Sequence, residues 1–71
     1  MSGLDLEIYN FIRRYAVENG FLPTITEIAE AFCFVISTAN YRLIKLEKNG
    51  YIVRHENGIR YSVKGLRYIA E

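Results

Sequence analysis

One short segment of the chain carries side chains that could read a nucleic acid. Over residues 37–45, polar and apolar side chains alternate at the spacing of a helix that buries one face. The polar set comprises hydroxyls, an amide, a phenol and two cations, namely Ser37, Thr38, Asn40, Tyr41, Arg42 and Lys45. Hydroxyls and amides can hydrogen-bond base edges in a DNA major groove, and long cations reach guanine or phosphate. The segment is therefore a candidate for contact with duplex DNA.

A helix must hold these side chains in one array. Ala39, Leu43 and Leu46 recur at three- and four-residue spacing, which predicts a helix over about residues 36–49 with this stripe buried. Gly50 is a typical residue to end it. The same geometry turns the polar set toward solvent or the flanks of the helix.

Each polar side chain also has a purely structural interpretation. Ser37 and Thr38 could simply begin the helix, and Tyr41 could pack against the segment that follows it. Arg42 and Lys45 could form surface ion pairs with nearby glutamates, each worth well under ~1 kcal/mol. The pattern alone leaves both interpretations open.

Two further helices are predicted before this segment. Apolar residues at helical spacing mark residues 4–19 as one helix, and Gly20 supplies a stop. A shorter helix follows over residues 24–32. There Thr24 can accept a hydrogen bond from the first turn, and Glu27 can complete a capping box.

After Gly50 the period changes from helix to strand. Two β-prone runs, residues 51–55 and 59–63, flank an Asn-Gly pair, which is the strongest short signal for a hairpin turn. A short last helix is expected after Ser62, through residue 69. Three helices, a hairpin and a short helix predict an α+β, mainly α fold, a winged helix-turn-helix, as a single domain over residues 1–71.

Composition is globular, and the charges are unevenly distributed. Hydrophobic residues make up 51% and charged residues 24% of the chain, with a net charge of only +1. Residues 1–35 carry two basic and five acidic side chains, whereas residues 36–71 carry seven basic and three acidic ones. This asymmetry favours a basic working face on the second half, although an ordinary solvated surface would explain it as well.

Several classes of function find no support in the sequence. One cysteine and one histidine make neither an internal disulfide nor a metal cluster. We find no nucleophile and base at useful spacing, no phosphate loop and no cofactor fingerprint, so we expect no enzyme and no cofactor. No apolar run approaches the roughly 18 residues of a membrane span, and a cytoplasmic, reducing setting is expected.

Three stretches carry a resemblance to known regulators. Residues 20–32, GFLPTITEIAEAF, resemble the start of the helix-turn-helix in the DNA-binding domain of the LexA repressor family. Residues 37–52, STANYRLIKLEKNGYI, look like the recognition helix and first wing strand of small bacterial, archaeal and viral winged-helix regulators. Residues 61–66, YSVKGL, are similar to the junction between wing and last helix.

The resemblance implies a function and a set of contacts. It implies sequence-specific binding of double-stranded DNA by a small transcriptional repressor, commonly a homodimer, associated with the nucleoid and not with a membrane.

Base contacts would come from the recognition helix, chiefly from Thr38, Asn40, Tyr41 and Arg42. Contacts to the DNA backbone are implied for Lys45 and for Thr24 or Thr26. The wing would present Arg54, His55, Asn57 and Arg60 to the adjacent minor groove or phosphates. Self-cleavage is not implied, because the protease domain of full LexA-type repressors is not among these residues.

One stretch departs from the pattern of the family. In AFCFVIST, residues 31–38, Cys33 stands where relatives usually have Gly, and Val35 and Ile36 stand where they usually have polar residues that start a helix. Phe32 and Phe34 are expected to bury the turn. With the modest net charge and six tyrosines, this stretch supports an alternative, a winged helix for protein interaction or assembly without specific DNA binding. Salt-insensitive binding would favour that alternative.

Overall fold

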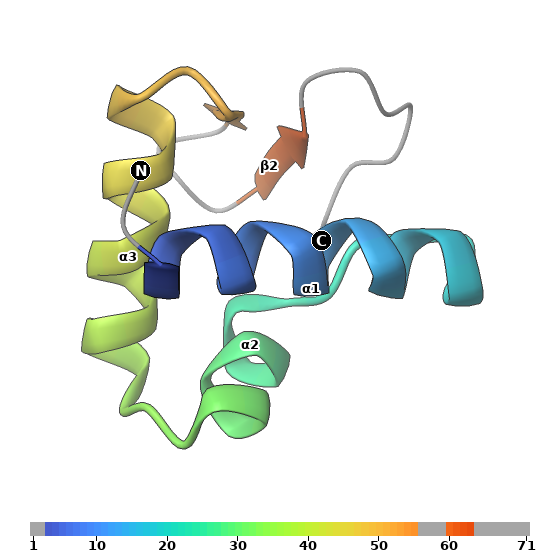
Figure 1. The fold of residues 1–71 in the computed structure, drawn as a ribbon, viewed down its shortest axis with the longest axis horizontal. Coiled ribbons are helices and arrows are strands. Elements are labelled where there is room, and N and C mark those ends of the chain that lie inside the picture. Colours follow the sequence, from blue (N-terminus) through green and yellow to red (C-terminus); the bar gives the residue numbers. More distant parts are fainter. Residues whose placement is uncertain (1–2, 56–59, 64–71) are drawn as a thin grey trace.

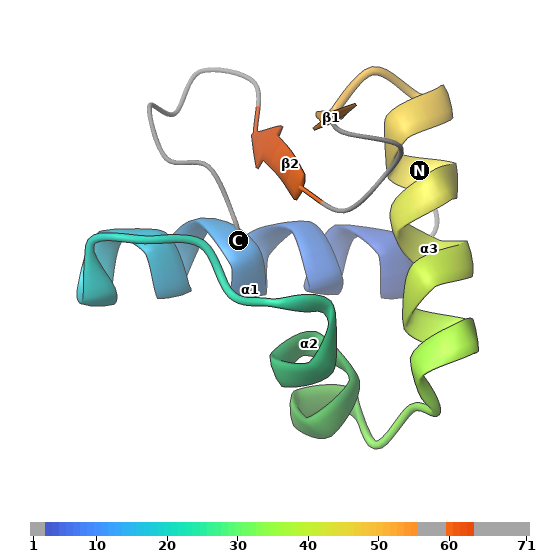
Figure 2. The ribbon, with the colours of Figure 1, turned by 180° about the vertical axis from the view of Figure 1, so that it is seen from behind.

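The computed structural model describes residues 3–55 and 60–63, which form three helices and one antiparallel pair of strands. Their bounds are α1 Gly3–Asn19, α2 Ile25–Phe32, α3 Ile36–Lys48, β1 Ile52–His55 and β2 Arg60–Val63. Helix α3 runs across one end of α1, and the strands lie on the opposite side of α1 from α2 (Figures 1 and 2). The predicted class, a winged helix-turn-helix, is confirmed. The Asn57 turn and the expected last helix lie outside the described residues.

The core forms where the apolar stripes of the helices meet. Ile8 and Ile12 of α1 and Leu43 and Leu46 of α3 have no exposed surface. Ile28 of α2 closes the layer from the other side and is equally buried. Burial of each such side chain contributes roughly 1.5–3 kcal/mol, which is how a chain this short can fold without a disulfide.

The wing is anchored to this core at one end. Strand β1 pairs with β2 in antiparallel register, with Ile52 opposite Val63 and His55 opposite Arg60. Ile52 and Val63 are almost fully buried, whereas the next residue, Val53, is exposed. Alternation along the strand therefore fixes the base of the wing on the helices and directs the other face outward.

Helix α2 begins with the predicted capping box. The Thr24 hydroxyl accepts a hydrogen bond from the Glu27 backbone N–H at 3.1 Å, and the Thr24 N–H donates to Glu27 Oε1 at 3.2 Å. The other carboxylate oxygen of Glu27 accepts a hydrogen bond from the Tyr15 hydroxyl. Glu27 thus caps α2 and joins it to α1.

This arrangement predicts a pH dependence of stability. Hydrogen bonds from the Tyr15 hydroxyl and the Thr24 backbone lower the pKa of Glu27, and the same Glu27 contact raises the pKa of Tyr15. A lowered carboxyl pKa gives stability that is full at neutral pH and lost as the pH falls through that pKa. The raised pKa of Tyr15 gives stability that is lost only at alkaline pH, as the phenol ionises.

We expect the difference in melting temperature between the parent chain and Glu27→Gln to shrink below about pH 4.5. Thermal unfolding followed by circular dichroism across pH 3–8 measures it. Glu18→Gln, at an exposed position on α1, is the matched control for the loss of one carboxylate.

The turn between α2 and α3 adopts the conformation that usually calls for glycine. Cys33 has φ 57° and ψ 38°, in the left-handed region, and is exposed. The Phe34 N–H then donates to the Ala29 carbonyl at 2.8 Å, which closes the end of α2. Phe32 and Phe34 stack with ring centroids 5.7 Å apart and pack on the core, as expected. Val35 occupies the N-cap of α3 and offers no side-chain hydrogen bond.

Cys33→Gly is expected to stabilise the domain by up to about 1 kcal/mol, because glycine adopts positive φ without a steric cost. The exposed thiol gives up no packing in exchange. Urea unfolding measures the change. Cys33→Ala retains the Cβ and should leave stability nearly unchanged, while Val35→Ser should add about 1 kcal/mol by capping α3. A loss of stability in Cys33→Gly would contradict the backbone argument.

Candidate nucleic-acid interface

Helix α3 forms one edge of the molecule, with α1 and α2 on its inner side (Figures 1 and 2). Its buried stripe, Ala39, Leu43 and Leu46, faces the core, as predicted. Ser37 and Tyr41 are exposed on the remaining surface. Thr38, Asn40 and Lys45 are half-buried at its flanks. The helix therefore presents hydroxyl, amide, phenol and ammonium groups outside the core.

Tyr41 and Lys45 act as a pair on this surface. They lie one helical turn apart, and the Lys45 ammonium nitrogen is 5.6 Å from the centroid of the Tyr41 ring. At this distance the cation is attracted to the ring face, by roughly 0.5–1 kcal/mol at an exposed site. The contact holds a positive charge beside the exposed phenol.

Asn40 is tied to the wing. The Arg54 guanidinium, on β1, donates a hydrogen bond from Nη2 to Asn40 Oδ1 at 2.7 Å. Such a short, charge-assisted bond is among the stronger ones that side chains form. It couples the position of the wing to a side chain on the candidate reading surface.

Arg42 is engaged inside the fold. Its Nη1 atom donates to Asp5 Oδ1 at 3.4 Å, and the Asp5 carboxylate on α1 is only 3% exposed. Arg42 Nε is buried and has no hydrogen bond within the described part of the chain. The side chain thus joins α3 to α1, and any base contact by Arg42 would compete with this ion pair.

The other residues that were expected to contact DNA lie on α2, on the paired strands and in the segment between the strands. The Thr24 hydroxyl is occupied by the capping box, whereas Thr26 is exposed on the first turn of α2. The backbones of His55 and Arg60 face each other at the far end of the paired strands. Asn57 lies outside the described residues. The structure brings Asn40 and Arg54 together, and it pairs Arg42 with Asp5 on α1.

Asp5, the partner of Arg42, was not predicted from the sequence as part of the candidate site. It lies on the same helical face as Ile8 and Ile12 and is 2% exposed. An acidic residue in the apolar stripe of a helix is a usable signal, since a buried carboxylate requires a donor.

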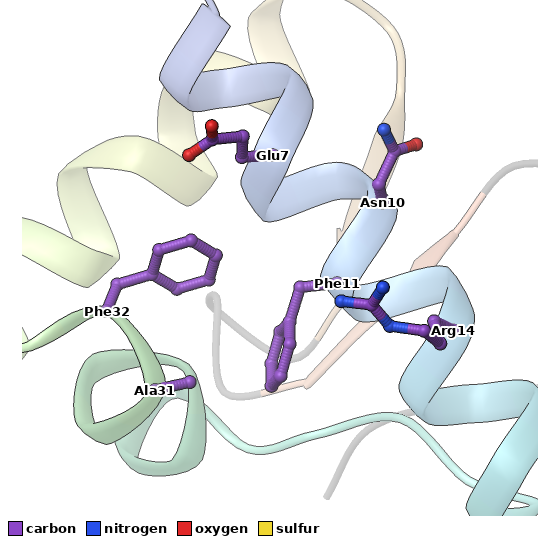
Figure 3. Close-up of a pocket in the computed structure, with 6 residues that line it drawn as sticks. All are labelled: Glu7, Asn10, Phe11, Arg14, Ala31 and Phe32. Atoms are coloured by element: carbon purple, nitrogen blue, oxygen red, sulfur yellow. The ribbon is translucent and has the colours of Figure 1, made fainter.

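A groove lies on another face of the molecule, between α1 and the end of α2. It encloses about 480 Å³ and is lined by Glu7, Asn10, Phe11, Arg14, Ala31 and Phe32. Phe11 and Phe32 meet edge to face, with ring centroids 5.5 Å apart. Figure 3 shows the two rings between the charged groups of Glu7 and Arg14, which come from the same helix.

Two features of other protein classes are absent from residues 3–55 and 60–63. No helix there combines the length and the apolar character that crossing a membrane requires. No group of three or more His, Cys, Asp or Glu side chains there is placed to hold a metal ion.

Comparison with known proteins identifies the family. The family model described as LexA DNA binding domain matches residues 3–60, a range that includes all three helices and β1. The chain belongs to the LexA DNA-binding domain family. Membership confirms the resemblance seen in the sequence, and with it the prediction of a DNA-binding domain of the repressor type.

Individual LexA relatives agree with the family match. The LexA repressor of Thermosipho melanesiensis is 37% identical over 54 residues, which are 76% of this chain and 27% of the relative. The LexA repressor of Carboxydothermus hydrogenoformans is 38% identical over 56 residues, 78% of this chain and 28% of the relative. The LexA repressor of Petrotoga mobilis is 43% identical over 49 residues, 68% of this chain and 24% of the relative. The match thus spans about a quarter of the length of these LexA repressors.

Proposed function

We propose that this chain binds a specific sequence in double-stranded DNA as a transcriptional repressor, with α3 in the major groove. The observation that carries the proposal is the outer surface of α3. In a LexA-type domain it presents Ser37, Tyr41 and Lys45 at the edge of the molecule. The wing would lie on the adjacent minor groove or backbone. Such a repressor works on the chromosome, in the nucleoid of the cytoplasm.

The side chains divide by the contact they suit. Ser37, Thr38 and Asn40 are short and lie in the first turns of α3, where side chains approach base edges closely. Lys45 lies further along and suits a phosphate, as does the exposed Thr26 on α2. Phosphate contacts position the protein, and base contacts select the sequence.

Selection from random duplexes, followed by binding measurements across salt, tests this proposal. We expect an enriched site, with a palindrome if two copies bind. We also expect affinity to fall with a log–log slope of about −0.9 per phosphate contact. For three such contacts, raising salt fourfold would weaken binding about 40-fold. Arg13→Ala, on the side of α1 where the guanidinium contacts Tyr9, is a control that should not change affinity. No enrichment at low salt would overturn the proposal.

One observation favours the alternative, a protein-interaction winged helix. Val35 and Ile36, at the head of α3, expose 67% and 57% of their surfaces, where a DNA-facing helix gains from polar groups. Titration of the labelled chain with duplex DNA separates the two. Under the repressor proposal, amide signals of residues 37–45 and of β1 shift and recover on adding salt. Under the alternative they do not respond to DNA.

We further propose that the chain forms a homodimer through the groove between α1 and α2. Glu7, Phe11 and Arg14 lie on one face of α1, and the two charges are separated by two helical turns, about 10 Å. No ion pair within the described residues engages Glu7 or Arg14. Packing two α1 helices antiparallel around a two-fold axis near Phe11 would set Glu7 against the partner's Arg14 at both ends. The surface is therefore complementary to itself.

Charge reversal tests this dimer by sedimentation velocity over a range of protein concentrations. Glu7→Arg and Arg14→Glu should each weaken dimerisation, because each places like charges in contact. The double variant should restore it. A monomer at all concentrations, or a dimer indifferent to these changes, would refute the proposed surface without affecting the proposal of DNA binding.

A further inference from the structure

The bond between Arg54 and Asn40 fixes which way the Asn40 amide faces. A guanidinium has only donors, so the atom that it contacts at 2.7 Å must be the carbonyl oxygen Oδ1. The amide nitrogen Nδ2 then lies on the other arm of the side chain. No hydrogen bond of Nδ2 is found within the part of the chain that the structure describes. Asn40 thus offers its two donors, while a cation already occupies one of the two lone pairs of its acceptor.

This orientation matters for reading a base. An asparagine that recognises adenine uses both arms, because Nδ2 donates to N7 while Oδ1 accepts from the N6 amino group. In this chain a cation already holds Oδ1, so such a contact would have to share or displace the guanidinium. Donation from Nδ2 alone meets no such obstacle. Its partners in the major groove are O6 and N7 of guanine, O4 of thymine and N7 of adenine. Adenine sets its N6 amino group, itself a donor, beside that N7 atom, so the keto bases are the better partners for a side chain that only donates.

We propose that Arg54 makes Asn40 a donor-only reader, which prefers a keto base, guanine or thymine, over an amino base, adenine or cytosine. Arg54 is a positioning residue, which acts on the base through Asn40. The inference rests on the proposed function, since it requires that α3 enters the major groove. It predicts which bases are preferred at one position of the binding site. It also predicts that this preference requires the wing to be packed against α3.

Several features of the contact support this role. The bond is charge-assisted and partly buried, so it survives better in water than an exposed pair. It also joins two elements that are 14 residues apart in sequence, so it forms only when the wing is seated on α3. Among the cations of α3 and β1 that the structure describes, Arg54 is the one that contacts Asn40, since Arg42 pairs with Asp5 and Lys45 lies beside the Tyr41 ring.

The test begins by finding the base pair that depends on Asn40. Selections from random duplexes with the full chain and with Asn40→Ala should differ in preference at one position. Binding is then measured to four duplexes that differ only at that position. For the parent chain we expect keto bases to bind about tenfold more tightly than amino bases.

Arg54→Met is the decisive variant, because it removes the donors but keeps an unbranched apolar stem to pack on the wing. We expect it to gain affinity for adenine relative to guanine and thymine at this position, with the other positions unchanged. Arg54→Lys retains a donor and should restore the keto preference. Lys45→Ala is the matched control, which should weaken binding to all four duplexes equally. Thermal unfolding of each variant verifies that it is folded under the binding conditions.

The outcomes separate the inference from the proposed function. No enriched site for the parent chain would overturn both. An enriched site with a preference for adenine at the Asn40 position would overturn the inference alone. So would a keto preference that Arg54→Met leaves intact, or a selection that Asn40→Ala does not change.

Discussion

Leu43→Ala is expected to lower the free energy of unfolding by about 3–4 kcal/mol, enough to leave much of the chain unfolded at 37 °C. Leu43 is fully buried at the centre of the α3 stripe, and it packs in the core that also holds Ile8, Ile12 and Ile28. Truncation removes apolar contact and leaves a cavity. A domain of this size has only a few kcal/mol in reserve. Urea unfolding followed by circular dichroism measures the loss.

The adjacent residue supplies the control for this prediction. Ile44 follows Leu43 on α3 and is only half-buried. Ile44→Ala should therefore cost about 1 kcal/mol, well below the change at Leu43. A loss under about 1.5 kcal/mol at Leu43 would mean that the core collapses around the missing side chain.

Arg42→Ala and Lys45→Ala both remove a cation from α3, but we expect the first to reduce stability and the second to reduce DNA affinity. Arg42→Ala should lower the free energy of unfolding by about 2 kcal/mol, because the buried Asp5 carboxylate loses the cation that joins α1 to α3. We expect its folded form to bind DNA nearly as well as the parent. Lys45→Ala should leave stability almost unchanged and weaken DNA binding about tenfold.

Stability and affinity must be measured separately to see this contrast. Urea unfolding gives the first, and binding at a temperature where each variant is folded gives the second. A stable Arg42→Ala variant with lost affinity would show that Arg42 leaves Asp5 to contact DNA, as the sequence resemblance suggested. Asp5→Asn is a further check, since it should resemble Arg42→Ala in stability.

The elements of this fold were predictable because their signals are local. The recognition helix was expected over about residues 36–49 and runs from Ile36 to Lys48. Its stop at Gly50 has a direct cause, since Gly50 has φ 83°. The Thr24 capping box was likewise visible as a spacing of three residues. Each of these features depends on residues within one or two turns of one another.

The links between elements were not predictable from the pattern. Arg42 and Asp5 are 37 residues apart, and helical periodicity places Arg42 only at the flank of α3. Its direction is decided by α1, which brings a carboxylate to that flank. Asn40 was expected to contact a base, but its bond to the wing was not predictable, since its partner Arg54 lies on β1. Which of the candidate side chains contact DNA stays a prediction.

The order of the elements also has a consequence for how quickly the chain folds. Helices α2 and α3 are consecutive and joined by a short turn, and β1 and β2 are separated by only four residues. Closing such short connections costs little chain entropy. The docking of α1 on α3, which are further apart in the sequence, is completed by burial of their apolar side chains in one shared core. Folding governed by neighbouring segments is rapid, so this domain should refold within about milliseconds.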